Sequence, residues 1–332
     1  MTGSALLEFA ASRIANGQAQ LAHHIKFQLS RSGHPAAAGL NYADNEVFLD
    51  PSLFAFCSDP DPTRTLDEIL QRPRASQMID GTGIGYSNTV DPLFVRLCEK
   101  AGGQAIEDSR DYEMEIASAL KHIRRISAKL YRCIVAVTRQ ITTFSDPGSE
   151  SFATLEAHGA VFLRTPPGID EVFFIEDLAH QCGHLIFNAA TIDPSQLITI
   201  DPQTPLADFT EDEDEARSLY VTLHGLFTES LMSIVLHGAL ELAMFTDRQR
   251  HEIRGRLSLI MRRFQLDLQS TRPLDVFTPE GRGLMTAFAT VFDEVFSAAR
   301  DEIVCCDLRN QPYAFSYDRF AELNPARAFS QS

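Results

Sequence analysis

The run between Arg217 and Glu241 restricts the fold more than any other part of the chain. It carries a single formally charged side chain, Glu229, and is long enough to cross a bilayer as a helix. The run also contains His224, several hydroxyl side chains and two glycines, and it has no basic flank. Because a carboxylate at mid-bilayer is costly, we expect a buried helix of a globular core and no membrane partner.

Composition narrows the class of protein. The length of 332 residues suggests one large domain or two ordinary ones, and the 44% hydrophobic and 22% charged residues are typical of a globular chain. A net charge of −16 repels phosphate backbones and anionic lipids, so we expect no nucleic-acid partner. The six cysteines are scattered and no secretory signal opens the sequence, which favours reduced thiols and a cytoplasmic location.

Apolar periodicity predicts mainly helices. We expect them over 4–30, 111–143, 170–190, 215–245, 249–270 and 279–303, with a strand or hairpin over 152–164. Thr65 and Glu68 form a capping box that opens a short helix. The expected class is therefore mainly α with a small β element (α+β), a helical bundle carrying a metal helix, for which a zincin-like arrangement is one option. We expect a helical N-terminal part over 1–145 and a metal-site catalytic part over 146–332, sharing one core.

The candidate metal helix contains two histidines at helical spacing. His180 and His184 are four residues apart, so both imidazoles project from one helix face and can bind one metal ion. Gly183 removes a side chain beside them, and Glu176 lies one turn earlier, where it can orient His180. The segment is otherwise apolar, which predicts that these histidines are buried.

A third ligand is sought on the apolar helix over 215–245. Glu229 shares a helix face with the small residues Thr222, Gly225 and Ser233, and we expect the gap left by Gly225 to leave room for an ion. An isolated carboxylate in an apolar helix is stabilised by a cation. His224 is the alternative third ligand. It lies about 140° away around the helix, so the two are not expected to bind one metal together.

Gln181 separates two kinds of metal chemistry. Zinc peptidases with an HExxH motif carry a glutamate at this position, which takes a proton from the metal-bound water. A glutamine amide cannot accept that proton. Two histidines, a carboxylate and no base form the ligand set of non-heme iron oxygenases.

Four segments together resemble one family. They are SESFATLEAHGAVFLRTP, IEDLAHQCGHLIFNAA, RSLYVTLHGLFTESL and FTPEGRGL. Their order and spacing are similar to those of the HExxH-type iron(II)- and 2-oxoglutarate-dependent peptide β-hydroxylases found beside natural-product pathways. The resemblance covers about residues 145–290, and Gln181 departs from the family motif.

This resemblance implies a set of roles. Iron would be bound by His180 and His184, with a further ligand matching His224 or Glu229, and Arg217 would bind the distal carboxylate of 2-oxoglutarate. Dioxygen is the second co-substrate. The implied substrate is a small amino-acid or peptide molecule, either free or presented by a carrier or leader.

The leading hypothesis is a non-heme iron(II), 2-oxoglutarate-dependent oxygenase that hydroxylates an aliphatic carbon of such a substrate in natural-product biosynthesis. One alternative is a zinc metallohydrolase-like protein or an inactive relative of one. A second is a metal-free helical binding protein. Neither the identity of the substrate nor the oligomeric state follows from the residues.

Overall fold

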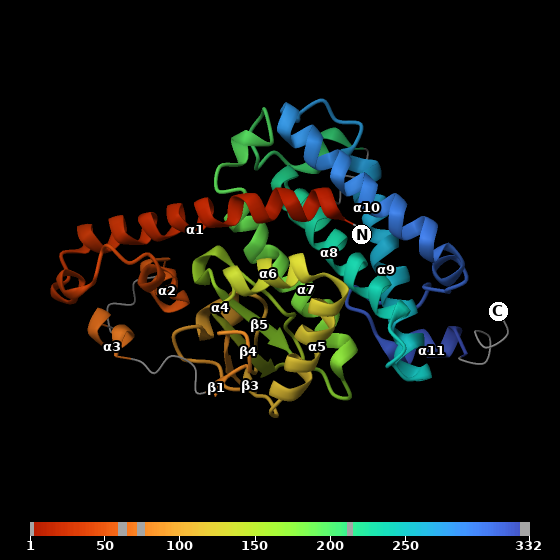
Figure 1. Ribbon diagram of the computed structural model, residues 1–332, viewed down its shortest axis with the longest axis horizontal. Helices are drawn as coiled ribbons and strands as arrows, with labels where there is room; N and C mark the ends of the chain where they lie inside the picture. Colours follow the sequence, from red (N-terminus) through yellow and green to blue (C-terminus); the bar gives the residue numbers. More distant parts are fainter. Residues whose placement is uncertain (1–2, 59–64, 72–76, 211–214, 326–332) are drawn as a thin grey trace. The chain divides into compact units, whose positions relative to one another are not determined.

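Helices make up most of the chain. The computed structural model describes residues 3–58, 65–71, 77–210 and 215–325 (Figure 1). The protein is 62% helix and 7% strand, with a small mixed sheet, so the expected α+β class is confirmed. Contacts between residues divide the chain into two compact units. We call residues 10–124 and 128–192 the N-terminal unit, and residues 1–9, 125–127 and 193–332 the C-terminal unit.

The sheet of the N-terminal unit is built around one central strand, β4 (Gln140–Ser145). The strand β5 (Ala160–Arg164) pairs with it in parallel, from Gln140 opposite Ala160 to Phe144 opposite Arg164. On the other edge, β2 (Gly85–Ser87) pairs in parallel with the first half of β4. The two-residue strands β1 (Gln77–Met78) and β3 (Glu107–Asp108) are antiparallel to β2 and β4, respectively.

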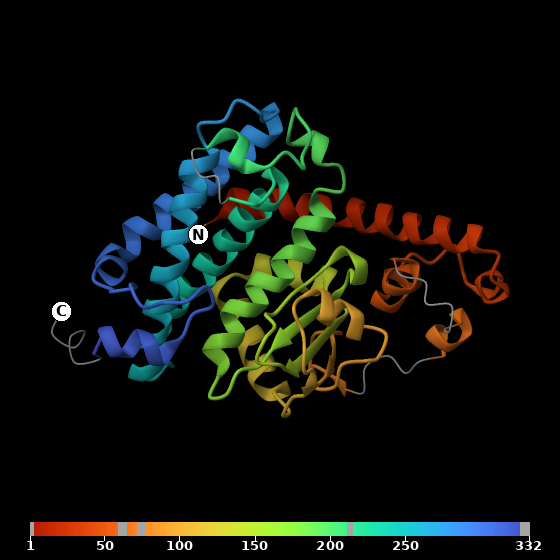
Figure 2. The same cartoon turned by 180° about the vertical axis from the view of Figure 1, so that it is seen from behind.

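The same unit contains several helices. They are α1 (Ser4–Ser32, from residue 10 onward), α2 (Pro51–Ser58), α3 (Leu66–Leu70), α4 (Val95–Lys100), α5 (Glu113–Ile126, to residue 124), α6 (Ala128–Val137) and α7 (Glu171–Ala190). The helix α7 contacts both β5 and α6 and runs across the sheet (Figure 2). Thr65 and Glu68 cap each other at the start of α3, so the predicted capping box is confirmed.

The single helix predicted over 111–143 is wrong. The chain forms α5, α6 and then β4, and Ile141 is a fully buried strand residue. The helical bonding ends at Thr138, whose amide donates to Ile134 O. The next two amides, of Arg139 and Gln140, both donate to Gly159 O, which starts the pairing with β5. An apolar residue every third or fourth position cannot reveal this change, because β4 is buried on both faces.

The C-terminal unit is a group of long helices. They are α8 (Leu219–Glu241), α9 (Asp247–Thr271) and α10 (Pro279–Val304), followed by the short α11 (Tyr317–Leu323). Each long helix starts at a hydroxyl cap, since the side chains of Ser218, Thr246 and Thr278 accept bonds from amides three residues later. The three long helices pack against one another (Figure 1). These helices match the predicted ranges to within a few residues.

The helix α8 is long and apolar enough to cross a membrane by length and composition. Of its most apolar window, 78% is buried inside the structure, as in the core helix of a globular unit. The six cysteines are all free thiols.

Candidate functional site

The predicted metal helix is α7, and its two histidines lie together. Asp170 caps the helix by accepting a bond from the amide of Val172. His180 and His184 follow on one face, with ring centroids 5.0 Å apart and planes inclined by 45°. Both side chains are half-buried. The i, i+4 spacing therefore brings the two imidazoles together as predicted.

His184 is held in its neutral form. Burial lowers the pKa of His184 from 6.5 to about 3, and the neighbouring His180 contributes in the same direction. Its imidazole is therefore uncharged at every pH near neutrality. A neutral imidazole is the form that binds a metal ion.

Gln181 is a structural residue of the same helix. Its side chain is 2% exposed, and its amide nitrogen Nε2 lies 3.3 Å from Ser151 O and 3.4 Å from Asp177 Oδ1. Ser151 Oγ in turn donates to Asp177 Oδ2 at 2.6 Å and accepts from the amide of Arg164 at 2.9 Å. We call Ser151, Asp177 and Gln181 the α7 latch. It ties the helix to the segment before β5 and to β5 itself.

The latch also contacts His180. Gln181 Nε2 lies 3.2 Å from His180 Nδ1. The two oxygens around it require the amide to present its N–H groups on this side, next to the His180 ring. Glu176 is half-buried one turn earlier on α7, and its orienting role stays a prediction.

Glu229 is a buried and incompletely hydrogen-bonded carboxylate of the C-terminal unit. It is 7% exposed, and its Oε2 has no hydrogen-bond partner among the described residues. Burial raises the pKa of Glu229 well above its ordinary value, and the nearby Asp267 carboxylate raises it further. The charges of Arg217 and Arg263 act in the opposite direction. Glu229 thus sits in the apolar helix as predicted and favours its protonated form.

Arg217 is enclosed by two carboxylates. Its Nη1 and Nη2 donate to Asp267 at 2.7 and 2.8 Å, and its Nε and Nη2 donate to Glu215 at 2.9 and 2.6 Å. These bonds raise the pKa of Arg217 above its ordinary range, with Glu215 contributing most. Both edges of the guanidinium are occupied, so binding of a keto-acid carboxylate would require one of the two partners to move.

The space expected beside Gly225 is filled. A Cβ atom placed on Gly225 would lie 3.2 Å from Asp267 Oδ2 and 3.7 Å from Arg217 Nη1. The expectation that this glycine leaves room for an ion beside Glu229 is therefore wrong. The missing side chain instead admits the ion pair between Arg217 and Asp267.

The predicted ligands are divided between the two units. His180 and His184 lie in the N-terminal unit, whereas Glu229 and His224 lie on α8 in the C-terminal unit. His224 is half-buried, with its ring 4.8 Å from that of Tyr220. Over the described ranges, no three His, Cys, Asp or Glu side chains form a group that could hold a metal ion. The third ligand stays a prediction.

Two acidic residues of these clusters were missed by the sequence analysis. Asp177 and Asp267 are both buried, at 9% and 5% exposure. A signal was available for each, since Asp177 lies four residues before Gln181 in an apolar helix and Asp267 interrupts the buried face of α9. Their partners Ser151 and Arg217 are distant in the sequence, so spacing alone could not pair them.

Compared with known proteins, the sequence matches no protein-family model, and no curated protein is significantly similar to it.

Proposed function

We propose that the protein is a non-heme iron(II), 2-oxoglutarate-dependent oxygenase that hydroxylates an aliphatic carbon of an amino-acid or peptidyl substrate in natural-product biosynthesis. One observation carries the proposal. His180 and His184 are adjacent on one face of α7, and burial keeps His184 neutral. Two adjacent imidazoles are suited to bind one divalent transition metal in their neutral form.

Gln181 supports an oxygenase over a hydrolase. A hydrolase needs a base that takes a proton from water, and the Gln181 amide has no such capacity. Its N–H groups face Ser151 and Asp177, so the side chain is a structural tie of the α7 latch. An oxygenase has no need of a protein base at this position.

The donor set suits iron(II). His180 and His184 would bind it, and Glu229, or His224 in its place, is the third ligand predicted from the sequence. The unpartnered, buried Oε2 of Glu229 is an atom that a cation would stabilise. Bound iron would supply the oxidising chemistry with 2-oxoglutarate and dioxygen as co-substrates. In this proposal α7 positions two ligands and the latch fixes the orientation of the helix. Arg217 would exchange one of its carboxylates for the keto acid.

A metal-free helical binding protein is the second candidate. It is favoured by the lack of a gathered three-ligand group among the described side chains and by the enclosure of Arg217. The zinc metallohydrolase-like alternative requires the same two histidines. The identity and amount of bound metal therefore distinguish the three hypotheses.

The experiment is anaerobic reconstitution of the full chain with iron(II), followed by 2-oxoglutarate. We expect one iron per chain, a weak visible charge-transfer band, and succinate release on admission of air. His180→Ala and His184→Ala should each remove the iron and the band. His23→Ala is the matched control, since His23 is exposed on α1 and should retain both.

Other results would identify the alternatives. Tight zinc in the purified protein with no band would favour the hydrolase-like reading. Protein that binds neither metal and keeps its thermal stability with a chelator would overturn the proposal in favour of a metal-free binding protein. Glu229→Ala and His224→Ala then decide the third ligand, since only the ligand's removal should abolish iron binding.

A further inference from the structure

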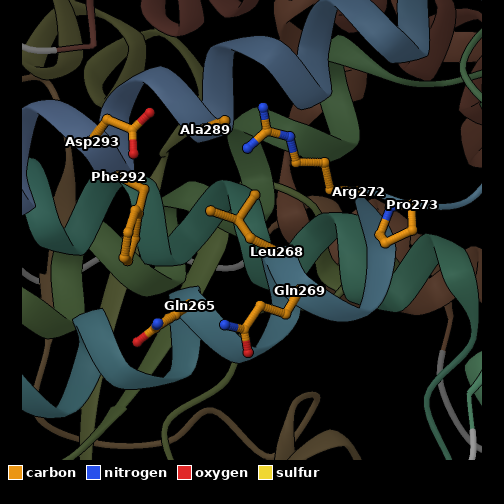
Figure 3. Close-up of a pocket in the computed structure, with 8 residues that line it drawn as sticks. All are labelled: Gln265, Leu268, Gln269, Arg272, Pro273, Ala289, Phe292 and Asp293. Carbon is orange, nitrogen blue, oxygen red and sulfur yellow. The ribbon is translucent and has the colours of Figure 1, made fainter.

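A groove lies between the last turns of α9 and the middle of α10, entirely within the C-terminal unit. Its cavity volume is about 420 Å³, near the lower end of the range for small-molecule sites. Figure 3 shows the residues that line it: Gln265, Leu268, Gln269, Arg272, Pro273, Ala289, Phe292 and Asp293. They recur three and four residues apart on each helix, so one face of α9 meets one face of α10.

The floor of the groove is apolar and fixed. Leu268 and Ala289 are 7% and 8% exposed. The ring of Phe292 meets that of Phe264 edge-on, with centroids 5.6 Å apart, and stacks on Phe296 at 5.6 Å. This aromatic wall is therefore held in place before any ligand arrives, which lowers the entropic cost of binding.

The rim of the groove carries one charge of each sign. Arg272 and Asp293 are exposed, and among the described residues neither side chain makes a hydrogen bond or an ion pair. The guanidinium of Arg272 extends toward Ala289, and Asp293 lies on the other side of Ala289 (Figure 3). Arg248 of α9, by contrast, pairs with Glu252. Within the described part of the chain, the rim therefore carries an unpaired cation, Arg272, and an unpaired anion, Asp293, on either side of an apolar floor.

We propose that this groove binds a small zwitterion whose ammonium and carboxylate groups are separated by an apolar body. The carboxylate pairs with Arg272, the ammonium pairs with Asp293, and the apolar body contacts Leu268, Ala289 and Phe292. An ω-amino acid or a short apolar peptide with free termini has this arrangement, because its two charges stand at opposite ends of the chain and each peptide residue adds roughly 3.5 Å between them. The site is independent of iron and of the proposed oxygenase activity.

Isothermal titration calorimetry of the full chain tests this site. The probes are ε-aminocaproate and leucyl-leucine, and the controls are caproate, hexylamine and leucyl-leucine blocked at both ends. We expect one site per chain, and binding up to about fivefold weaker for each ion pair that a control cannot form, because exposed ion pairs contribute up to about 1 kcal/mol each. Tighter binding of leucyl-leucine would identify a peptide, whose amide the exposed Gln265 and Gln269 can bond. Tighter binding of ε-aminocaproate would identify a free ω-amino acid.

Matched variants locate the binding. Arg272→Gln and Asp293→Asn should each weaken ε-aminocaproate binding by up to about fivefold, which corresponds to the loss of one exposed ion pair. Arg262→Gln and Asp301→Asn, at exposed positions of the same two helices outside the groove, should leave it unchanged. All four positions are exposed, so the fold should be retained.

A charge exchange gives the sharpest result. The double variant Arg272→Glu with Asp293→Lys keeps both charges but reverses their order. It should restore binding of ε-aminocaproate, whose two ends can exchange places. Lack of saturable binding to the unmodified chain, equal binding of the uncharged blocked dipeptide, or equal losses in the Arg262 and Asp301 variants would overturn the proposal.

Discussion

At the scale of single residues, His158 is a polar side chain buried in an apolar part of the N-terminal unit. It is fully buried, and neither ring nitrogen has a hydrogen-bond partner among the described residues. Its ring centroid lies 5.6 Å from that of Phe54. Burial lowers the pKa of His158 from 6.5 to about 3, with the charge of Arg139 adding to the effect. The folded protein therefore keeps this imidazole neutral in weak acid.

His158→Leu should stabilise the protein and reduce its sensitivity to acid. Below about pH 6.5 the imidazole of His158 becomes protonated in the unfolded chain. In the folded protein it stays neutral until the pH nears 3. Stability should thus fall with pH by about 1.4 kcal/mol per unit across this window. The leucine variant should lose that slope and gain about 1–2 kcal/mol at neutral pH, since two unpaired nitrogens disappear. Urea unfolding across the window measures both, and an unchanged slope would contradict the argument.

Gln181→Glu tests whether the latch tolerates the glutamate of an HExxH motif. The new carboxylate would face Asp177 Oδ1 and Ser151 O, both of which now accept from the amide. Like charges should raise the folded-state pKa, so the loss of stability should be small at acid pH and grow as pH rises past the ordinary carboxyl value. We expect a cost of about 1–3 kcal/mol at neutral pH. Equal urea midpoints for variant and parent at neutral pH would show that the latch is not required.

At the scale of elements, the long helices were predictable and the short strands were not. The helices α7 to α10 have both an apolar face and a side-chain cap, and these two local signals agree. The strands β1 and β3 are two residues long and have exposed side chains, so no periodicity marks them. Ile141 has a helical spacing from the apolar residues before it, and its strand is revealed only by long-range pairing with β2 and β5.

The candidate site divides in the same way. His180 and His184 follow from local spacing on one helix. The bonds from Ser151 to Asp177 and Gln181, and those from Arg217 to Asp267, span 26 to 50 positions in the chain and have no local pattern. For the same reason the sequence predicted an open space at Gly225, where the fold places an ion pair.

Packing of α1 against α7 depends on one glycine. A Cβ atom on Gly17 would lie 1.6 Å from Ala189 O, a backbone atom that cannot move alone. Gly17→Ala should therefore destabilise the N-terminal unit by about 1–3 kcal/mol despite the better helix propensity of alanine.

Gly283→Ala is the matched control. Gly283 lies within α10, and nothing is within 4 Å of its would-be Cβ atom. This variant should gain up to about 1 kcal/mol from helix propensity alone. Thermal unfolding measures both variants. A gain for both would mean that the contact between α1 and α7 is less close than described.

At the scale of the whole molecule, net charge governs behaviour in solution. The chain carries −16 at pH 7 and has an isoelectric point of about 5.0. Mutual repulsion should keep the protein dispersed at neutral pH, and that repulsion should vanish near pH 5. Light scattering should therefore show a maximum of association near pH 5 and a decline on either side. A flat profile through the isoelectric point would contradict this expectation.

The bond between Gly3 and Glu294 has a consequence for the order in which the protein is made. The Gly3 amide donates to Glu294 Oε2 across 291 positions, and a Cβ atom on Gly3 would meet Ile234 and Val291. At 5–20 residues per second, a ribosome needs roughly 15–60 s to synthesise the chain from Gly3 to Glu294. The start of α1 can therefore complete its contacts in the C-terminal unit only after Glu294 has been synthesised.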